Sequence, residues 1–513
     1  MSIKKNAAAN FAGQFYRAGI GILMLPVYLQ FLGEESYGLV AFFSLLSSWL
    51  VLFTASIAPT LARQVAYARG QGKLGGSQFR EMLRSLELIV VAIGVLLMLA
   101  GLISSGWLAM HWLTVETLEL SSVSYCIALM GIMAGLTPAL GMYSSGISGL
   151  ERQVWLNGFS IAFATLRFGS IYVLLRWVST DVVHYFQFQL ALSLLELIVV
   201  ARKFYACQPA GARSHDPGLR FSWHAIKSVL PFASGIAYTS VLWILMTQSD
   251  KLVLSHVLSL SEFGYFGIVV ILANGVLLFS SPINRAVLPR MTMHHSRGNS
   301  AALVGLYRTS TQFLAVTVFS VGGVLATFSQ PVIYALTGNQ AASEWGAPVL
   351  TWFAMGNILL VIVGLQYSLQ FAHGNVRLHV INTTINAIIQ VPILVFVALD
   401  YGALAVAKTW FAIRLVAFFV WPAIVHRKFA PGLHWKWIKD DLLPPFLGLV
   451  VSLGLIEFAL THPSSIAMSD SRIHIVFALI GSGIAVLAIC AFCAKEVRKQ
   501  ALRFIAGFGE RFI

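Results

Sequence analysis

Residues 10–38 read NFAGQFYRAGIGILMLPVYLQFLGEESYG, an apolar run that carries an arginine where an ordinary membrane span avoids a charge. On a helix, Asn10, Gln14 and Arg17 follow one another at i, i+4 and i+7, so they share one face. Pro26 can bend this helix, and the acidic turn LGEESYG ends it before the chain returns to apolar residues. The stretch therefore predicts a membrane helix with one polar stripe.

The composition places the whole chain in a membrane. Hydrophobic residues make up 58% of the 513 residues, charged residues make up 11%, and the mean hydropathy is +0.79. A soluble domain carries roughly 25% charged residues, so we expect an all-α integral membrane protein. The 4 cysteines form no disulfide framework, and we find neither a P-loop nor a His/Cys set spaced for a metal. No metal, no cofactor and no ATP motor is therefore expected.

Apolar runs separated by polar breaks predict about fourteen membrane spans, with both termini on the same side. Most of the 34 Lys and Arg residues lie in segments on the terminus side, including 433–441 and the C-terminal tail, which are read as amphipathic surface segments. The opposite loops hold only Arg176, Lys251 and Arg472. The positive-inside rule then places both termini in the cytoplasm, and the net charge of +14 indicates contact with anionic lipid, not a nucleic-acid site. The spans are expected near residues 10–32, 37–61, 86–109, 122–146, 154–176, 183–202, 229–250, 264–284, 309–330, 347–370, 379–399, 403–425, 442–461 and 473–494.

The opening unit has a degenerate second copy. LGEESYGLVAF (32–42) aligns with LSLSEFGYFGI (258–268), which sets Tyr37-Gly38 against Phe263-Gly264. Six predicted spans separate the copies, so the pattern predicts two pseudo-symmetric six-helix lobes around a central cleft that opens by alternating access. The expected domains are an N-terminal lobe (1–205), a cytoplasmic linker loop (206–228), a C-terminal lobe (229–430), and two extra helices with a basic cytoplasmic tail (431–513).

Charged residues inside the predicted spans are the main site candidates. A charge near the bilayer centre costs roughly 3 kcal/mol or more unless it has a partner or a wet cavity. The basic ones are Arg17, Arg167, Arg414 and Lys408, the last close enough to a span end to reach the interface, and they outnumber Glu196 and Glu457. Because guanidinium groups bind phosphate oxygens bidentately, this surplus matches a pyrophosphate headgroup. The alternative for Arg17 is a structural ion pair with Glu196 or another acid.

Further polar residues allow two interpretations each. Asn382, Asn386 and Gln390 share a helix face and either join helices or bind sugar hydroxyl groups. Glu196 is the candidate for a titratable coupling residue, or it pairs with Arg167 or Arg17. Two pairs near span ends remain. Asp250 and Lys251 pair with each other or close an outer gate, and Arg285 and Arg290 anchor to lipid or steer a pyrophosphate inward.

The opening helix with its asparagine, the LGxxxYG turn, and the later stretch QSDKLVLSHVLSLSEFGYFG resemble the Wzx-type polysaccharide flippases. This family belongs to the MOP superfamily, together with the MATE exporters and the lipid II flippase MurJ. The resemblance implies a transporter that moves an undecaprenyl-pyrophosphate-linked oligosaccharide, such as an O-antigen unit of lipopolysaccharide, from the inner to the outer leaflet of the bacterial inner membrane. It also implies that the first span, and thus Arg17, lines the cleft. Coupling to an H⁺ or Na⁺ gradient and partnership with other polysaccharide assembly proteins follow from the same resemblance.

Three alternatives remain open. A lipid II flippase fits the count of fourteen spans, because Wzx-type members are usually assigned twelve. A MATE-like drug or ion antiporter would favour acidic residues in its cleft, which is the opposite of the surplus here. A membrane polysaccharide polymerase is disfavoured because it needs a sizeable extramembrane loop, and the loops of this chain are short. We therefore expect a transporter and not an enzyme.

Overall fold

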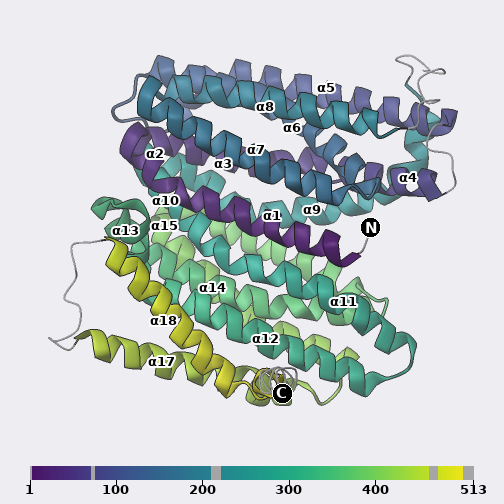
Figure 1. Cartoon of the computed structure of the whole chain (residues 1–513), viewed down its shortest axis with the longest axis vertical. Coiled ribbons are helices and arrows are strands. Elements are labelled where there is room, and N and C mark those ends of the chain that lie inside the picture. The colour runs from purple at the N-terminus through teal and green to yellow at the C-terminus, as the bar shows by residue number, and fades with distance from the viewer. Residues whose placement is uncertain (1–2, 71–75, 209–220, 462–471, 501–513) are drawn as a thin grey trace, which may run out of the picture. The chain divides into compact units, whose positions relative to one another are not determined.

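The computed structural model describes residues 3–70, 76–208, 221–461 and 472–500 (Figure 1). Within these ranges every regular element is a helix, and the sole β-type pairing is an isolated bridge between Thr114 and Ser259. The same ranges contain 12 helices that are long and apolar enough to cross a membrane. The prediction of an all-α membrane protein is confirmed.

The chain packs into two compact units, the first of which comprises Met1–Gly264 together with Asn386–Val391. Within this unit α5, α6 and α8 lie side by side, and α1 packs along α7 (Figure 1). Its elements are α1 (Ile3–Leu23), α2 (Leu25–Leu32), α3 (Glu34–Thr54), α4 (Ile57–Gly70), α5 (Ser77–Trp107), η1 (Leu108–Trp112), α6 (Leu120–Gly149), α7 (Gln153–Val173), η2 (Leu174–Val178), α8 (Val182–Ala206) and α9 (Trp223–Val257).

The second unit comprises Tyr265–Ile385 and Pro392–Ile513, so the unit boundary falls inside α10 (Leu260–Gly275). Here α12 packs against α14, α17 and α18. The remaining elements are η4 (Val276–Phe279), α11 (Ser280–Ser296), α12 (Ser300–Thr327), α13 (Ser329–Thr337), α14 (Gln340–Ala372), α15 (Arg377–Phe429), α16 (His434–Lys436), η5 (Trp437–Leu442), α17 (Leu443–Thr461) and α18 (Arg472–Cys493). The predicted division of the chain into two six-span halves stays a prediction.

Backbone breaks fall where Pro and Gly occur in the sequence. The first predicted span is divided at Met24, and Pro26 stands at the start of α2, where its missing N–H costs no helical hydrogen bond. The 53-residue α15 contains Gly402 at φ 72° and ψ −169°, a conformation that is open to glycine and strained for other residues. This single residue turns α15 into two crossings, which correspond to the predicted spans at 379–399 and 403–425.

Helices cover all fourteen predicted spans, including the one at 229–250, which lies within the 35-residue α9. Two spans were placed imperfectly. The second ends at Thr54, because residues 57–70 form the separate helix α4. The eighth ends near Gly275, where one turn of 3₁₀-helix precedes α11.

Glu35, in the acidic turn after the first span, has a structural role that its sequence context does not indicate. Its buried carboxylate accepts hydrogen bonds from the backbone N–H groups of Glu116 (2.6 Å), Thr117 (2.9 Å) and Leu118 (3.0 Å), and from the Thr117 hydroxyl. Three otherwise unpaired amides of the loop between η1 and α6 are thereby satisfied. The turn thus fastens this loop to the start of α3.

The two copies of the repeat touch each other within the first unit. A Cβ added to Gly38 would lie 1.9 Å from the carbonyl oxygen of Leu260, and one added to Gly264 would lie 3.1 Å from the backbone nitrogen of Gly38. These are the two glycines that the sequence alignment set against one another. Glycine is required here because α3 and the start of α10 approach backbone to backbone.

Replacing Gly38 by alanine should force these backbones apart, because the nearest obstacle is a carbonyl group and not a flexible side chain. We expect Gly38→Ala to lower the free energy of unfolding by about 1–3 kcal/mol, the usual cost of overpacking. Thermal unfolding of the detergent-solubilised protein, followed by size-exclusion chromatography, measures the effect. Gly158→Ala in α7 is the matched control, since nothing lies within 4 Å of the added Cβ. Equal stability of the two variants would contradict this reading of the contact.

Candidate functional site

The first unit contains a half-buried ion pair between two membrane helices. The Arg167 Nη2 of α7 lies 2.8 Å from the Glu196 Oε2 of α8, with the side chains 28% and 22% exposed. The Arg167 guanidinium also lies over the Phe163 ring, 5.4 Å from its centroid. Arg17 of α1 acts electrostatically on the same carboxylate. The structure therefore brings Arg167 and Glu196 into contact, and with Arg17 acting on the same carboxylate two cations are set against one anion.

Arg17 is exposed on α1, and among the described residues it makes no ion pair within 4 Å. Gln14, one turn earlier, is half-buried. Asn10 belongs to α1, but its side chain lies outside the described residues. The helix is held to α7 by the Tyr16 hydroxyl, which lies 2.6 Å from the Thr165 Oγ1.

Buried tyrosines extend this polar region, and sequence reasoning missed them. Tyr28 packs edge-on against Tyr185 with ring centroids 5.7 Å apart, and it stacks on Tyr37 at 6.1 Å. The Gln189 amide donates a 3.0 Å hydrogen bond to the Tyr185 hydroxyl. Arg167 acts electrostatically on the hydroxyls of Tyr28 and Tyr185. The Tyr-to-Gln spacing at i, i+4 in α8 was the available signal.

Arg414 in α15 is a buried cation among the described residues of the second unit. Its side chain is only 8% exposed, and its guanidinium carbon lies 4.1 Å from the centroid of the Trp410 ring. Lys408 is exposed instead, as a snorkelling lysine would be. The two predicted cations of this segment thus occupy different environments.

The amide stripe of α15 is used in part to join helices. Gln390 is buried, and its Nε2 donates a 2.7 Å hydrogen bond to the carbonyl oxygen of Met246 in α9. Asn382 and Asn386 are half-buried. Gln390 therefore joins two helices. The positions of Asn382 and Asn386 are compatible both with joining helices and with binding sugar hydroxyl groups.

The residues near span ends are placed as follows. Asp250 is fully buried, and the Lys251 Nζ lies 3.3 Å from its Oδ1 and donates to the carbonyl oxygen of Thr247 at 2.5 Å. These two residues therefore pair with each other, which is one of the predicted alternatives. Arg290 is exposed on α11. The side chain of Arg285 lies outside the described residues.

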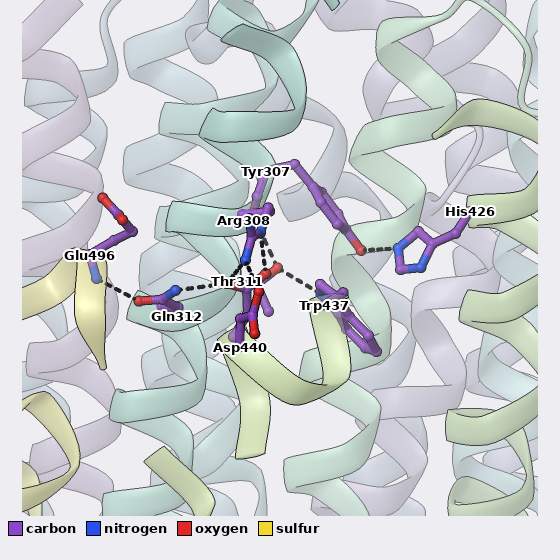
Figure 2. A network of polar contacts seen from close by, with 9 residues as sticks. Tyr307, Arg308, Thr311, Gln312, His426, Trp437, Asp440 and Glu496 are labelled. Carbon is purple, nitrogen blue, oxygen red and sulfur yellow. Dashed lines mark hydrogen bonds and ion pairs between the residues drawn. The ribbon is translucent and has the colours of Figure 1, made fainter. Parts of the chain in front are cut away.

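A second polar network, which sequence reasoning missed, connects α12 with η5 and with the chain after α18 (Figure 2). The Arg308 Nε donates to the Asp441 Oδ2 at 2.7 Å, and its Nη2 donates to the Asp440 Oδ2 at 3.0 Å. Gln312 donates to the Asp441 Oδ1 at 2.7 Å and accepts from the backbone N–H of Glu496 at 2.8 Å. This network fastens the last two spans to α12.

The segment 433–441 has an exposed face, which includes Lys436 and Lys439, and a buried face that packs into the protein. Trp437 and Asp441 are both fully buried, and the Trp437 Nε1 donates to the Thr311 Oγ1 at 3.1 Å. In the same region the Tyr307 hydroxyl lies 2.9 Å from the His426 Nε2 (Figure 2). The overlooked signal is an Asp-Asp pair directly before an apolar span, which requires a cationic partner.

The two aspartates of this network allow a matched comparison. Asp441 is fully buried and Asp440 is 59% exposed, yet both bind Arg308. We expect Asp441→Asn to reduce the free energy of unfolding by about 2 kcal/mol, because the fully buried carboxylate that accepts charge-assisted hydrogen bonds from Arg308 is lost. Asp440→Asn should cost less than about 1 kcal/mol. Thermal unfolding in detergent distinguishes the two, and a larger loss for Asp440→Asn would show that Asp441 does not hold the network together.

Long apolar helices with basic residues inside them define a multi-span membrane protein. A family model described as "Polysaccharide biosynthesis protein" matches residues 3–295, which is more than half of the chain. The chain belongs to this family. No curated protein matches the chain by sequence.

The fold is similar to those of several solved transporters. One is the lipid II flippase MurJ in an inward closed conformation, with a TM-score of 0.68, 14% identity, and coverage of 95% of this chain and 98% of that one. Another is an inward-facing multidrug resistance MATE family transporter (0.62, 13%, covering 81% and 95%). A third is a MOP superfamily transporter from Pyrococcus furiosus (0.57, 11%, covering 82% and 95%). At these identities the likeness shows the fold alone, and it confirms the predicted similarity of the fold to those of MurJ and the MATE transporters.

Proposed function

We propose that this protein is a flippase that moves an undecaprenyl-pyrophosphate-linked oligosaccharide from the inner to the outer leaflet during polysaccharide biosynthesis. The observation that carries the proposal is the group formed by Arg17, Arg167 and Glu196 within the membrane helices of the first unit. Its surplus positive charge complements a pyrophosphate, and guanidinium groups can hold phosphate oxygens bidentately. Membership of the polysaccharide biosynthesis family supports the glycan as cargo.

An apolar cavity in the second unit supports a lipid-linked cargo. It has a volume of about 520 Å³ and lies between α12, α14, α15 and α17. Its walls include Phe319, Leu359, Phe418, Leu442 and Phe446. Such walls offer no hydrogen bonds to a sugar, but they suit a hydrocarbon chain. In this proposal the lipid tail stays in apolar surroundings while the polar head crosses.

The remaining predicted residues have proposed roles around the same cargo. Asn10, Gln14 and Lys408, with the amides Asn382, Asn386 and Gln390, would contact the head and its sugars. Asp250 and Lys251 would gate the outer side, and Arg285 and Arg290 would attract the pyrophosphate at the inner mouth. We propose alternating access driven by an H⁺ or Na⁺ gradient, in the bacterial inner membrane with both termini cytoplasmic. Other polysaccharide assembly proteins are the proposed partners.

Three rival functions are weaker candidates. Similarity of the fold to MurJ favours a lipid II flippase as the second candidate, because lipid II also carries a pyrophosphate. A MATE-like exporter of cationic drugs would meet electrostatic repulsion at Arg17 and Arg167. A polysaccharide polymerase has no support from the similar structures, which are transporters.

The proposal is tested by reconstituting the full chain in liposomes with an undecaprenyl-pyrophosphate-linked oligosaccharide and measuring the glycan exposed to an impermeant glycosidase. Arg17→Ala should slow flipping about tenfold, which corresponds to about 1.4 kcal/mol of lost interaction. Arg17→Lys should retain part of the rate because it keeps the charge but not the fork. Arg152→Ala, which removes an exposed arginine, is the control. Flipping of lipid II in preference to the oligosaccharide lipid would replace the proposal by its rival, and unchanged flipping by Arg17→Ala would remove Arg17 from the site.

Glu196→Gln tests the proposed coupling residue. The amide keeps the size of the carboxylate but cannot exchange a proton, so the variant should lose the response of the flipping rate to an imposed pH gradient. Glu151→Gln is the control, because it also alters an Arg–Glu pair, but the pair is exposed. Unchanged transport with an unchanged response to pH would leave Glu196 with a structural role alone.

A further inference from the structure

A cation and two exposed aromatic rings lie together at the end of α7. The helix widens there into the π-turn η2, in which the Ser179 N–H donates to the carbonyl oxygen of Leu174 at 2.9 Å. Trp177 in this turn is 69% exposed, and its ring packs edge-on against the Tyr172 ring with centroids 5.9 Å apart. Tyr172 is 40% exposed. The span therefore ends in an indole face that another molecule can contact.

Arg176, the residue before Trp177, is turned back toward the first span. Its guanidinium carbon lies 5.9 Å from the centroid of the Phe31 ring in α2, and the Phe31 ring meets the Tyr172 ring edge-on at 6.4 Å. Among the described residues Arg176 makes no ion pair within 4 Å. An arginine that serves only to reach lipid headgroups extends away from the protein, whereas this one lies over a ring of a neighbouring helix.

The helix α2 links this cluster to the surroundings of the charged group in the first unit. Tyr28 stands one turn before Phe31, so the two rings lie on the same side of α2. Tyr28 packs edge-on against Tyr185 of α8 with centroids 5.7 Å apart, and Arg167 acts electrostatically on the hydroxyls of both tyrosines. Aromatic residues of one helix therefore extend from the neighbourhood of Arg167 to that of Arg176.

Polar groups follow the exposed indole along the chain. The Asp181 Oδ1 accepts a hydrogen bond from the Val183 N–H at 2.9 Å, and the Asp181 N–H donates to the Ser179 Oγ at 3.1 Å. The side chains of Asp181 and His184 are both about half exposed. The end of this span thus combines an apolar ring face with hydrogen-bonding groups. A sugar offers the complementary surface, because a pyranose ring has an apolar face of C–H groups and a rim of hydroxyl groups.

We propose that Arg176 and Trp177 form a second subsite for the cargo, in which the guanidinium binds a phosphate group and a sugar ring stacks on the indole. This inference rests on the proposed function and adds a place for the sugars. Because the two residues are consecutive, one subsite contacts both the phosphate and the sugar attached to it. In the proposed topology this end of α7 is the outer end, so the subsite holds the cargo after its head has crossed. The rival interpretation is a tryptophan that only anchors the span at the membrane surface.

The test measures binding to the full chain in detergent of two lipids, undecaprenyl pyrophosphate and the undecaprenyl-pyrophosphate-linked oligosaccharide of the flipping assay. Trp177→Leu should weaken binding of the oligosaccharide lipid about tenfold and leave undecaprenyl pyrophosphate unchanged, because only the sugar contacts the indole. Trp177→Phe keeps a smaller ring and should retain part of the affinity. Arg176→Gln should weaken both lipids by the same factor, because both carry the pyrophosphate.

Trp107→Leu is the matched control, since Trp107 is another exposed tryptophan at a span end and stacks on His111. Equal effects of Trp107→Leu and Trp177→Leu would assign Trp177 to membrane anchoring and overturn the inference. So would an equal loss of both lipids by Trp177→Leu, or unchanged binding of undecaprenyl pyrophosphate by Arg176→Gln.

Undecaprenol, which lacks phosphate, distinguishes failure of this inference from failure of the proposed function. If the unaltered protein does not prefer undecaprenyl pyrophosphate to undecaprenol, the proposed function fails, and this inference fails with it. If that preference is present but the Trp177 variants bind the oligosaccharide lipid as tightly as the unaltered protein does, only this inference fails.

Discussion

The structure depends on how charges are accommodated inside membrane helices. Water is absent from a hydrocarbon layer, so each ionised side chain requires a counter-charge, an aromatic face, or a polar cavity. The chain uses the first for Arg167 and Arg308, which bind Glu196 and Asp441. It uses the second for Arg414, which lies on Trp410. These solutions differ in the net charge of the resulting group, because a carboxylate neutralises a cation whereas an aromatic ring does not.

This difference separates structural cations from candidate binding groups. Arg308 contacts two carboxylates and ties the last spans to α12, which is a role in assembly. Arg17 and Arg167 have one carboxylate between them, and Arg414 rests on an indole. Arg17 and Arg167, which share the Glu196 carboxylate, are the residues to which we assign the pyrophosphate of the cargo. The apolar cavity beside α12 lies in the second unit, and its walls suit the lipid part of the proposed cargo.

Much of the fold was predictable from hydropathy, because membrane helices must be long, apolar and internally hydrogen-bonded. Pro26 and Gly402 lie at breaks between helices, because proline lacks a backbone N–H and glycine tolerates a positive φ. The pairing of Arg167 with Glu196 was one of two stated alternatives, since spacing along a chain does not tell which helices become neighbours. The network at Arg308 was missed for the same reason, as Asp441 is distant in sequence. The aromatic support of Arg414 was also unpredictable, because Trp410 reads as an ordinary lipid-facing or core residue.

The turn at Gly402 has a practical consequence for anyone labelling this protein. The two crossings of α15 are joined by one residue of left-handed backbone and not by a flexible connector. An epitope, a fluorophore tag or a protease cleavage sequence inserted there would interrupt a turn that depends on the backbone conformation of Gly402. Topology mapping at this hairpin is therefore better done with single cysteines at exposed neighbours such as Tyr401 than with inserted sequences.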